Sequence, residues 1–320
     1  MRTVLVGYGH AARDLHRVAI EESVVGRLVT DMVAVDPAYP AGPARAGGGP
    51  DLTVYATLGD LPGIDGSDVF HVTVPPAGHG SVVEEIVALG GRRIVVEKPL
   101  TTDGPAARRM AKLCADAGAD LFPVAVWPFS SGVARVRGLL DAGRRPLHYE
   151  FEQSKNRIER TLGNTSHSSA FEVELPHQVL AAIWLFGDIT DVLHAEARPL
   201  RHAGREVPHA GGAYLVVRHS SGLTGTLVGH LDKERRTRRL RVVCADGDVE
   251  VALPCSRDET SSFFKDGAGP VLDLPDRPLT ECLVSAYTAG PAESQARFNV
   301  DMHVHCIDVL EAARGKAGVP

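Results

Sequence analysis

The chain has 320 residues, of which 44% are hydrophobic and 23% are charged; this supplies enough apolar material for two folded domains and excludes a disordered chain. The formal net charge is −6 and the pI is near 6.2, so no general attraction to nucleic acid or to an anionic membrane is expected. These values are typical of an enzyme that acts on a small molecule, and equally of most cytosolic proteins.

The N-terminus and the cysteines point to a cytoplasmic protein without disulfide bonds. No segment approaches the roughly 20 apolar residues that cross a bilayer, and Met1–Gly7 enters a strand-like run without the core of a signal peptide. The five cysteines are scattered and form no Cys-x-x-Cys pair, which argues against a disulfide framework and a structural zinc site. We expect buried free thiols and no bound metal.

The first 125 residues alternate short apolar runs with amphipathic stretches. Apolar runs without polar alternation are typical of parallel strands that are covered on both faces. The runs expected as strands are Val4–Gly7, Met32–Asp36, Val69–Val74, Ile94–Glu97 and Leu121–Val126. The stretches expected as helices are Ala11–Glu22, His79–Leu89 and Pro105–Ala117, the last with Asp103 as its N-cap. This alternation predicts an α/β domain of the Rossmann type, with a doubly wound parallel sheet.

The first expected strand leads into a glycine-rich turn. Val4–Ala12 reads as a strand, a Gly-x-Gly-x-x-Ala turn and the start of a helix. Gly7 permits the tight turn, Gly9 lets a pyrophosphate approach the backbone, and Ala12 keeps helix and strand close. The helix start offers free N–H groups to phosphate oxygens. The residues expected to bind a dinucleotide here are Gly7, Tyr8, Gly9, His10, Ala11 and Ala12.

Asp36 ends the second expected strand, where a carboxylate can accept hydrogen bonds from both hydroxyls of an adenosine ribose. The same charge would repel the extra phosphate of NADP, and no Arg or Lys follows before Arg45, so we expect NAD. The alternative is that Asp36 is only a turn residue before Pro37. The next segment, Pro37–Pro50, is dense in Pro and Gly and is expected to be a loop over the adenosine end of the cofactor.

After about residue 126 the pattern becomes that of a largely antiparallel sheet with a few helices. Helices are expected over Ser131–Asp141, Phe171–Phe186 and Glu293–Ala313. Strands are expected over Leu147–Ser154, Ile189–Glu196, Ala213–His219, Leu223–Leu231, Leu240–Cys244 and Asp248–Leu253. The expected domains are therefore a dinucleotide-binding Rossmann domain over residues 1–122 and a second α/β domain, with a large open sheet, over residues 123–320.

Two further features argue against other kinds of site. Lys233–Arg241 is the strongest charge run, and we interpret it as an exposed hairpin or a subunit contact rather than a nucleic-acid site. His303 and His305 are two positions apart on an expected helix, so they point in different directions and cannot form an i, i+4 metal pair. Zinc is therefore not expected.

Two segments and the glycine-rich turn give the chain a family resemblance. Phe70–His79 contains a strand, a Pro pair and a His that opens a helix, and Ile94–Leu100 carries Glu-Lys-Pro after a strand. Together with His16, these segments resemble the glucose–fructose oxidoreductase and inositol dehydrogenase family, called Gfo/Idh/MocA. The resemblance covers essentially the whole chain and is stronger in its N-terminal half. It implies a second domain whose open sheet supports the substrate and often mediates oligomerisation, so a homo-oligomer (a dimer or tetramer) is expected.

In that family the lysine of Glu-Lys-Pro lies beside the nicotinamide and the substrate, so the resemblance implies a catalytic role for Lys98. The proline after it is commonly preceded by a cis peptide. Chemistry gives a separate reason: hydride loss from a carbinol needs a group that takes the hydroxyl proton, and a partly desolvated lysine can do so. The alternative is a surface lysine paired with Glu97. The residues of these segments expected near the cofactor are Thr73, Val74, Pro75, His79, Glu97 and Lys98.

The second catalytic element resembles the family's Asp-x-x-x-His helix, which precedes a Trp-Leu-(Leu/Phe)-Gly ending. His177 stands ten residues before Gly187 and matches the family's histidine, which relays a proton together with the aspartate. The aspartate position, four residues earlier, is Val173 here. Glu174 or Glu172 is the candidate to replace it. His177 is the expected general acid or base because an imidazole titrates near neutrality.

Substrate-binding side chains are expected at the start of the second domain. The family's Arg-x-x-Pro stretch reads Val126–Phe129 here, so Trp127 is expected to form an apolar or stacking wall, with core packing as the alternative. Lys155 and Arg157 leave the first strand of this domain and are expected to bind hydroxyls, a carboxylate or a phosphate. A solvated loop is the equal alternative for them. His177 completes the expected substrate set.

These observations predict reversible hydride transfer between NAD(H) and a carbon that bears a hydroxyl or carbonyl, on a sugar, a cyclitol or a related polyol. Lys98 would hold or deprotonate the oxygen, and His177 would relay the proton. The replaced aspartate leaves three other functions open. They are an imine or ketone reductase of a specialised biosynthetic pathway, a regulatory protein that binds dinucleotide or sugar without turnover, and an eliminase or epimerase with transient oxidation.

Overall fold

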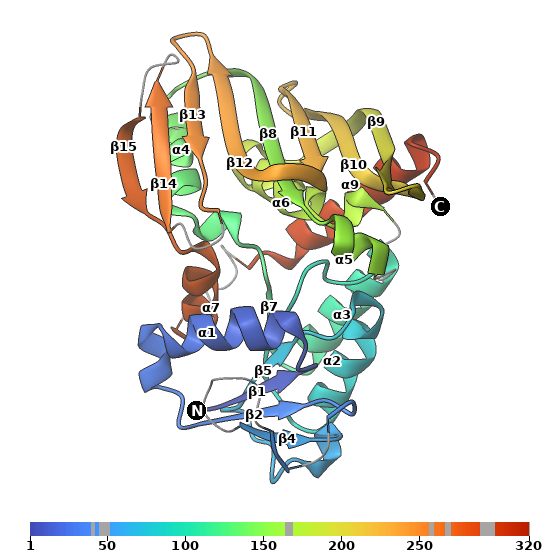
Figure 1. The fold of residues 1–320 in the computed structure, drawn as a ribbon. Helices are drawn as coiled ribbons and strands as arrows, with labels where there is room; N and C mark the ends of the chain where they lie inside the picture. The colour runs from blue at the N-terminus through green and yellow to red at the C-terminus, as the bar shows by residue number, and fades with distance from the viewer. Residues whose placement is uncertain are drawn as a thin grey trace. The chain divides into compact units, whose positions relative to one another are not determined.

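The computed structural model describes residues 1–39, 42–44, 52–163, 169–255, 259–265, 270–288 and 298–319. Contacts group these residues into two compact units: Met1–Ala125 with Leu279–Val304, and Val126–Pro278 with His305–Pro320. Each unit is built around one sheet, and each is described by itself (Figure 1).

The first unit contains a seven-stranded sheet in the order β3-β4-β2-β1-β5-β6-β7. Its strands are β1 (Arg2–Val6), β2 (Asp31–Val35), β3 (Gly42–Ala44), β4 (Leu52–Tyr55), β5 (Val69–Val72), β6 (Arg93–Val96) and β7 (Asp120–Pro123). All neighbours pair in parallel except β3, which runs antiparallel to β4 at the edge. The doubly wound parallel sheet is thus confirmed, with β3 and β4 added to the five strands that the sequence predicts.

The helices of the first unit follow the expected pattern. They are Ala11–His16, a π-helical turn that continues as α1 (Arg17–Glu21), then α2 (His79–Ala88), α3 (Gly104–Asp116), α7 (Pro278–Thr288) and the first residues of α9 (Val300–Lys316). Asp103 caps α3 as predicted, since its carboxylate accepts a 2.7 Å hydrogen bond from the N–H of Ala106. The sequence did not predict α7, which brings a distant part of the chain into this unit.

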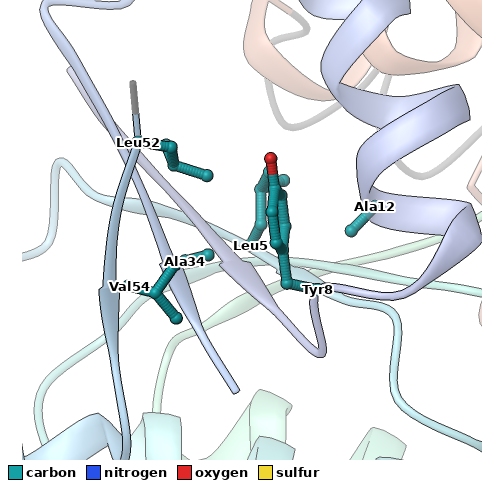
Figure 2. Close-up of a cluster of buried hydrophobic side chains, with 6 residues drawn as sticks. All are labelled: Leu5, Tyr8, Ala12, Ala34, Leu52 and Val54. Carbon is teal, nitrogen blue, oxygen red and sulfur yellow. The ribbon is translucent and has the colours of Figure 1, made fainter. Parts of the chain in front are cut away.

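A buried apolar cluster anchors the glycine-rich turn to the sheet. Figure 2 shows the cluster, which consists of Leu5, Tyr8, Ala12, Ala34, Leu52 and Val54. Tyr8 comes from the turn itself and is fully buried, and its hydroxyl accepts a 2.9 Å hydrogen bond from Arg17. Burial of a large apolar side chain stabilises the fold by about 1.5–3 kcal/mol, so this ring holds the backbone of the turn in place.

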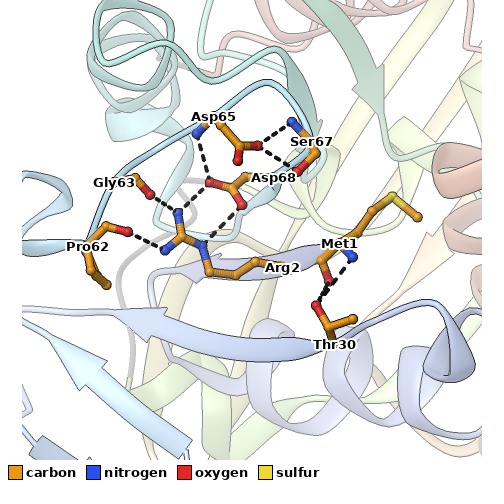
Figure 3. Close-up of polar contacts among 8 residues, drawn as sticks. All are labelled: Met1, Arg2, Thr30, Pro62, Gly63, Asp65, Ser67 and Asp68. Atoms are coloured by element: carbon orange, nitrogen blue, oxygen red, sulfur yellow. Dashed lines mark hydrogen bonds and ion pairs between the residues drawn. The ribbon is translucent and has the colours of Figure 1, made fainter.

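A polar cluster ties the beginning of β1 to the loop before β5. Arg2 donates hydrogen bonds to both carboxylate oxygens of Asp68 (Figure 3). Its guanidinium also donates to the carbonyl oxygens of Pro62 and Gly63. The side chains of Arg2 and Asp68 are 14% and 5% exposed, so the pair is largely removed from water. Loss of either partner would leave a buried charge uncompensated.

The second unit contains an eight-stranded sheet in the order β15-β14-β13-β12-β8-β11-β10-β9. Its strands are β8 (Pro146–Asn156), β9 (Ile189–His202), β10 (Arg205–His219), β11 (Thr224–His230), β12 (Asp232–Cys244), β13 (Val249–Ala252), β14 (Thr260–Lys265) and β15 (Pro270–Pro275). Only β8 and β11 pair in parallel, which confirms a mostly antiparallel sheet. The helices of this unit are α4 (Ser131–Asp141), α5 (Ile158–Gly163), α6 (Leu175–Phe186) and the rest of α9.

The central strand β8 shows how the two faces of this sheet differ. Tyr149 and Gln153 are buried, and the ring of Tyr149 stacks on Phe186 of α6. Glu150 and Glu152, at the alternate positions, form ion pairs with arginines of β12. One face is therefore covered by helix, and the other carries paired charges, as the two-residue period of a strand dictates.

Two expectations about the elements are wrong. The charge run Lys233–Arg241 lies within β12 and is not a hairpin; acidic residues of β8 and β13 stand opposite its arginines and allow so charged a segment to remain a strand. The segment Pro37–Pro50 is not loop throughout, because Gly42–Ala44 form β3; its residues 40–41 and 45–50 lie outside the described part of the chain. The start expected for the last helix, at Glu293, also lies outside the described residues.

Candidate functional site

A cavity of about 560 Å³ lies in the first unit, at the carboxyl ends of β1, β2, β4 and β5. Open α/β sheets bind their ligands at this end, next to the strands where the order reverses, which are β1 and β5 here. The expected cofactor residues that line the cavity are Gly7, Gly9, Asp36, Thr73, Val74 and Pro75. The sequence did not predict the lining residues Ala56, Thr57 and Leu58 after β4, or Val82 and Glu85 of α2.

Gly7 and Gly9 of the turn are glycines for different physical reasons. Gly7 has a φ of +87°, and a Cβ there would lie 2.8 Å from the side chain and the backbone nitrogen of Val74. Only glycine therefore fits the protein's own packing at this position. Apart from its two chain neighbours, no described residue has an atom within 4 Å of a Cβ placed on Gly9, although Gly9 lines the cavity. The free space beside Gly9 fits a ligand that approaches the backbone, as a pyrophosphate does.

Asp36 connects the end of β2 to the glycine-rich turn. Its Oδ2 accepts a 2.8 Å hydrogen bond from the N–H of Tyr8, and its Oδ1 accepts a 2.9 Å hydrogen bond from the N–H of Ala38. Each carboxylate oxygen has a second lone pair, and Asp36 lines the cavity, so the group can also accept from a ligand. The sequence left open whether Asp36 only shapes the turn or binds a ligand. In this geometry it can do both.

The turn after β5 is held from two sides. Thr73 donates from its hydroxyl to the carbonyl of Gly7 at 2.7 Å. The ring of His79 lies 2.9 Å from the carbonyl oxygen of Val74 and 3.1 Å from that of Pro99. Burial lowers the pKa of His79, although these carbonyls and the charge of Glu97 act to raise it. His79 is fully buried and is not among the lining residues, so the structure makes it a bridge between two turns.

Glu97 and Lys98 form the next turn, after β6. The Lys98–Pro99 peptide is cis, as the family resemblance implied. The Glu97 carboxylate accepts a 3.0 Å hydrogen bond from the N–H of Lys98 and a 2.9 Å one from the ring of His16. Burial acts to raise the pKa of Glu97, but the hydrogen bond and charge of His16, followed by the charge of Lys98, bring it below its ordinary value. An ionised carboxylate is thus held directly behind the lysine.

The remaining residues of the glycine-rich turn do not line the cavity. Tyr8 and Ala12 are buried in the core cluster, so only their backbone is available to a dinucleotide. His10 is exposed and its ring is hydrogen-bonded to Asp14 at 2.8 Å. Ala11 follows as the first residue of the helix. The turn would therefore contact a dinucleotide through N–H groups rather than side chains.

In the second unit, Glu174 is the centre of a buried polar cluster. Its side chain is 5% exposed and forms an ion pair and hydrogen bond with Lys155. With its amide oriented to satisfy both neighbours, Gln153 donates to Glu174 at 2.9 Å and accepts from the indole N–H of Trp127 at 2.8 Å. Trp127 is only 2% exposed. It therefore packs in the core of this unit, which is the alternative that the sequence left open for this residue.

Two arginines stand around the same carboxylate. Burial lowers the pKa of both Arg157 and Arg238, and the charge of Glu174 acts in the opposite direction on each. Arg238 stacks over the ring of Trp127, with its guanidinium carbon 5.4 Å from the ring centre. Arg238 was not predicted from the sequence, because it lies within the charge run. In the structure it stands opposite Gln153 in the strand register, and its side chain lies over Trp127. Three cations thus surround one carboxylate in this cluster.

The two candidates for the missing aspartate differ in their partners. Glu172 forms an ion pair with Arg314 of α9 at 3.1 Å, whereas Glu174 faces Lys155. The helix expected from Phe171 begins only at Leu175, after a short 3-10 turn, and Glu174 is its N-cap residue. His177 follows in the first turn of α6 and is partly buried; its N–H donates to the carbonyl of Glu174 at 3.2 Å.

Three negative findings concern only the described parts of the chain. No three His, Cys, Asp or Glu side chains gather there as a metal site would require. None of the helices there is long and apolar enough to cross a membrane. All five cysteines are free thiols, and Cys255 is the one among them that is partly exposed.

The comparisons with known proteins agree with this geometry. Residues 1–124 match the family described as "Oxidoreductase family, NAD-binding Rossmann fold", which is Gfo/Idh/MocA. No curated protein matches the chain.

Solved structures resemble the whole chain. KijD10, a 3-ketoreductase from Actinomadura kijaniata in complex with TDP-benzene and NADP, is 16% identical, with a TM-score of 0.76 over 99% of this chain and 97% of that one. GnnA, a UDP-N-acetylglucosamine 3-dehydrogenase from Acidithiobacillus ferrooxidans, is 15% identical, with a TM-score of 0.74 over 100% and 98% of the chains. The WlbA dehydrogenase from Bordetella pertussis, in complex with NADH and UDP-GlcNAcA, is 17% identical, with a TM-score of 0.72 over 99% and 96%.

At these identities the likeness to solved structures shows the fold alone, and it extends over both units. The family match is a separate finding, and it falls on the segment that contains the cavity, the glycine-rich turn and the Glu-Lys-Pro turn. Residues 1–124 are thus similar to the Gfo/Idh/MocA oxidoreductases with an NAD-binding Rossmann fold, and residues 125–320 lie outside this match.

Proposed function

We propose that the protein transfers a hydride between NAD(H) and a carbon that bears a hydroxyl or carbonyl on a sugar, a cyclitol or a related polyol. Residues 1–122 would act as the cofactor domain and residues 123–320 as the substrate domain. The observation that carries the proposal is the space beside Gly9 in a cavity that Asp36 also lines, within the family's Rossmann segment.

NAD is the preferred cofactor because of the charges at the cavity. Its described lining includes two carboxylates, Asp36 and Glu85, and no Lys or Arg. Among the described lining residues, the extra phosphate of NADP would therefore meet repulsion and no compensating cation. Arg45 lies outside the described residues.

Lys98 is proposed as the residue that binds the substrate oxygen. Bound NAD supplies the hydride acceptor; the chain must then supply a group for the hydroxyl proton. The Lys98 amine takes this proton in the oxidation direction and returns it in the reduction direction. The ionised Glu97 behind it, held by the Lys98 N–H at 3.0 Å, orients the turn.

His177 is proposed as the second proton carrier, with Glu174 as its acidic neighbour. Glu174 is preferred to Glu172 because it is the N-cap residue of α6, whose first turn contains His177, whereas Glu172 pairs with Arg314 of α9. Lys155 and Arg157 are proposed to bind polar groups of the substrate. Trp127 supports this cluster from the core through Gln153 rather than by contact with substrate.

The substrate class to test first is a nucleotide-linked sugar. KijD10 is described as a 3-ketoreductase in complex with a TDP compound, and WlbA as a dehydrogenase in complex with UDP-GlcNAcA. In this chain, the cations of Lys155, Arg157 and Arg238 all interact with the carboxylate of Glu174. Such a cluster favours a substrate that carries a phosphate or a carboxylate.

The test is turnover of a panel of TDP- and UDP-sugars and free polyols, followed by the absorbance of NADH in both directions. Lys98→Ala is expected to lower the turnover rate about 100-fold or more, while its NADH dissociation constant stays within about threefold of that of wild type. Tight cofactor binding by wild type without turnover of any substrate would favour the regulatory alternative. Absence of binding to NADH and NADPH would refute the proposal altogether.

Self-association through the open sheet of the second unit is also proposed, in a protein that works in the cytoplasm. The exposed face carries Glu150, Glu152, Arg239 and Arg241 in paired ladders, which two copies can extend across a shared interface. Light scattering coupled to size exclusion would report a dimer or tetramer. A strictly monomeric chain at high concentration would refute the proposed self-association but would not bear on the proposed activity.

A further inference from the structure

A continuous chain of hydrogen bonds runs behind the Glu-Lys-Pro turn, entirely within the first unit. From the Glu97 carboxylate it passes to His16 Nε2 at 2.9 Å, and from His16 Nδ1 to His71 Nδ1 at 2.8 Å. From His71 Nε2 it passes to the Tyr287 hydroxyl at 2.8 Å, and from there to the Thr3 hydroxyl at 2.7 Å. We call these five residues the histidine chain.

The histidine chain joins parts of the fold that are far apart in sequence. Its members come from β1, the first helix, β5, the end of β6 and α7. His16, His71 and Thr3 are fully buried, and Tyr287 is 4% exposed. A buried chain in which every polar atom has a partner restricts the protonation states that are possible, because each hydrogen can serve only one link.

Within the described residues, the titratable groups that act on the histidine chain come from several elements. Lys98, His16, His79 and Cys282 face Glu97, and Arg93 acts on Tyr287. Burial, followed by the charge of His16, lowers the pKa of His71 well below its ordinary value. His71 is therefore neutral, with one ring nitrogen that donates and one that accepts.

Two arrangements satisfy every link. The ionised Glu97 can only accept, so His16 Nε2 always donates to it. When His16 is neutral, its Nδ1 accepts from His71 Nδ1–H. The Tyr287 hydroxyl then donates to His71 Nε2, and the Thr3 hydroxyl donates to Tyr287.

The second arrangement appears when His16 takes up a proton. His16 Nδ1–H then donates to His71, whose Nε2–H donates to the Tyr287 oxygen, and the Tyr287 hydroxyl donates to Thr3. No hydrogen bond is lost, and the link from His16 to Glu97 keeps its direction, but the three links from His16 to Thr3 reverse. The charge presented to Lys98 also changes, since the Glu97 anion is now neutralised by a cation in direct contact.

We propose that the histidine chain is a proton-dependent positioning array for Lys98: one proton on His16 reverses its hydrogen bonds and cancels the charge of Glu97. His16, His71 and Tyr287 are then positioning residues, not catalytic ones. The arrangement with neutral His16 is the active one in the reduction direction, because a Glu97 anion without a cation on His16 favours the charged form of Lys98, which donates the proton to the new hydroxyl. This last step rests on the proposed function, whereas the reversal itself does not.

Nitrogen-15 NMR of histidine-labelled protein tests the reversal without cofactor or substrate. Signals of His16 and His71 are assigned from single variants, and the ring tautomers are read between about pH 5 and pH 9. The expected result is that His71 carries its proton on Nδ1 at high pH and on Nε2 at low pH, changing together with the charge of His16. A His71 tautomer that is constant, or that changes independently of His16, overturns the proposal.

Thr3→Val tests the consequence for activity. Valine has the shape of threonine but accepts no hydrogen bond, so only the second arrangement leaves the buried Tyr287 hydroxyl without its acceptor. The second arrangement is therefore disfavoured, and the acidic limb of the kcat/KM profile for the reduction is expected to move to lower pH by about one unit. The NADH dissociation constant should not change.

Thr226→Val is the matched control, since that threonine hydroxyl also contacts a histidine ring, His148 at 3.2 Å, but in the second unit. Its acidic limb is expected to coincide with that of wild type. If the Thr3→Val profile also coincides with wild type, the proposal is overturned. If the tautomer reversal is seen but no substrate is turned over, the proposed function fails and the positioning array stands.

Discussion

Replacement of Asp36 by asparagine separates its two roles. The carboxylate accepts backbone hydrogen bonds from Tyr8 at 2.8 Å and from Ala38 at 2.9 Å, and it lines the cavity. Asparagine keeps one acceptor oxygen but presents an NH₂ group in place of the other and removes the charge. The variant therefore loses one acceptor for a ribose hydroxyl and for one of the two backbone N–H groups, and it also loses the charge that repels a nearby phosphate. The loss at the turn affects both cofactors alike, so the ratio of their dissociation constants reports the ligand role.

The two cofactors should respond in opposite directions. A hydrogen bond to a charged group contributes about 1.5–3 kcal/mol, so loss of one is expected to weaken NADH binding by about 10- to 100-fold. Two unit charges about 4 Å apart interact with about 4 kcal/mol near a protein surface, so removal of the Asp36 charge relieves NADPH of a repulsion at least as large. The ratio of the NADPH to the NADH dissociation constant is expected to fall by about 100-fold or more.

Titration of NADH and NADPH by nicotinamide fluorescence at constant ionic strength measures this ratio. Asp65→Asn is the control, because that carboxylate also holds a turn, accepting from the N–H of Ser67 at 2.7 Å, but lies outside the cavity lining. Its ratio should equal that of wild type. An equal loss of affinity for both cofactors in Asp36→Asn would show that Asp36 serves the turn alone and would refute the argument.

Three further outcomes follow from the geometry. Gly9→Ala should keep the melting temperature of wild type, because its Cβ meets no atom of the described residues within 4 Å beyond its chain neighbours, yet it should weaken NADH binding at least about tenfold. Gly7→Ala should instead destabilise the fold itself. Arg2→Met should lower the free energy of unfolding by about 3–5 kcal/mol in urea melts, since it leaves Asp68 buried without its partner; a loss below about 1 kcal/mol would contradict this. Burial lowers the pKa of His303 to about 3 from 6.5, so as pH falls below about 6.5 the unfolded state binds a proton first and stability decreases by about 1.4 kcal/mol per unit. His303→Leu should remove this contribution between about pH 7.5 and pH 5.5, and an unchanged pH slope would contradict it.

Continuous apolar runs made most of the first sheet predictable. Val69–Val72 is buried at every position, and a strand covered on both faces needs such a run. Leu52–Tyr55 was missed because it is short, alternates buried and exposed positions and follows a Pro- and Gly-rich stretch. The glycine-rich turn and Asp36 were found in place, since they act through backbone geometry that the residue types report directly.

The direction in which side chains point could not be predicted from the sequence. Trp127 was expected at a substrate wall, but residue type does not tell whether an aromatic ring faces a ligand or the core. Arg238 lies among eight other residues of a charge run, and only the strand period and its register with Gln153 single it out. Tyr287 hydrogen-bonds to Thr3 across 284 positions, a pairing that no local pattern indicates.

His79 has a consequence that concerns the two turns it joins. Its ring faces the carbonyl oxygen of Val74 on one side and those of Pro99 and Leu100 on the other, and all three are acceptors only. Because its pKa is lowered, the His79 imidazole is neutral and carries a single N–H group. The cofactor turn and the lysine turn therefore compete for one hydrogen, and whichever turn lacks it has a carbonyl oxygen set against a ring lone pair.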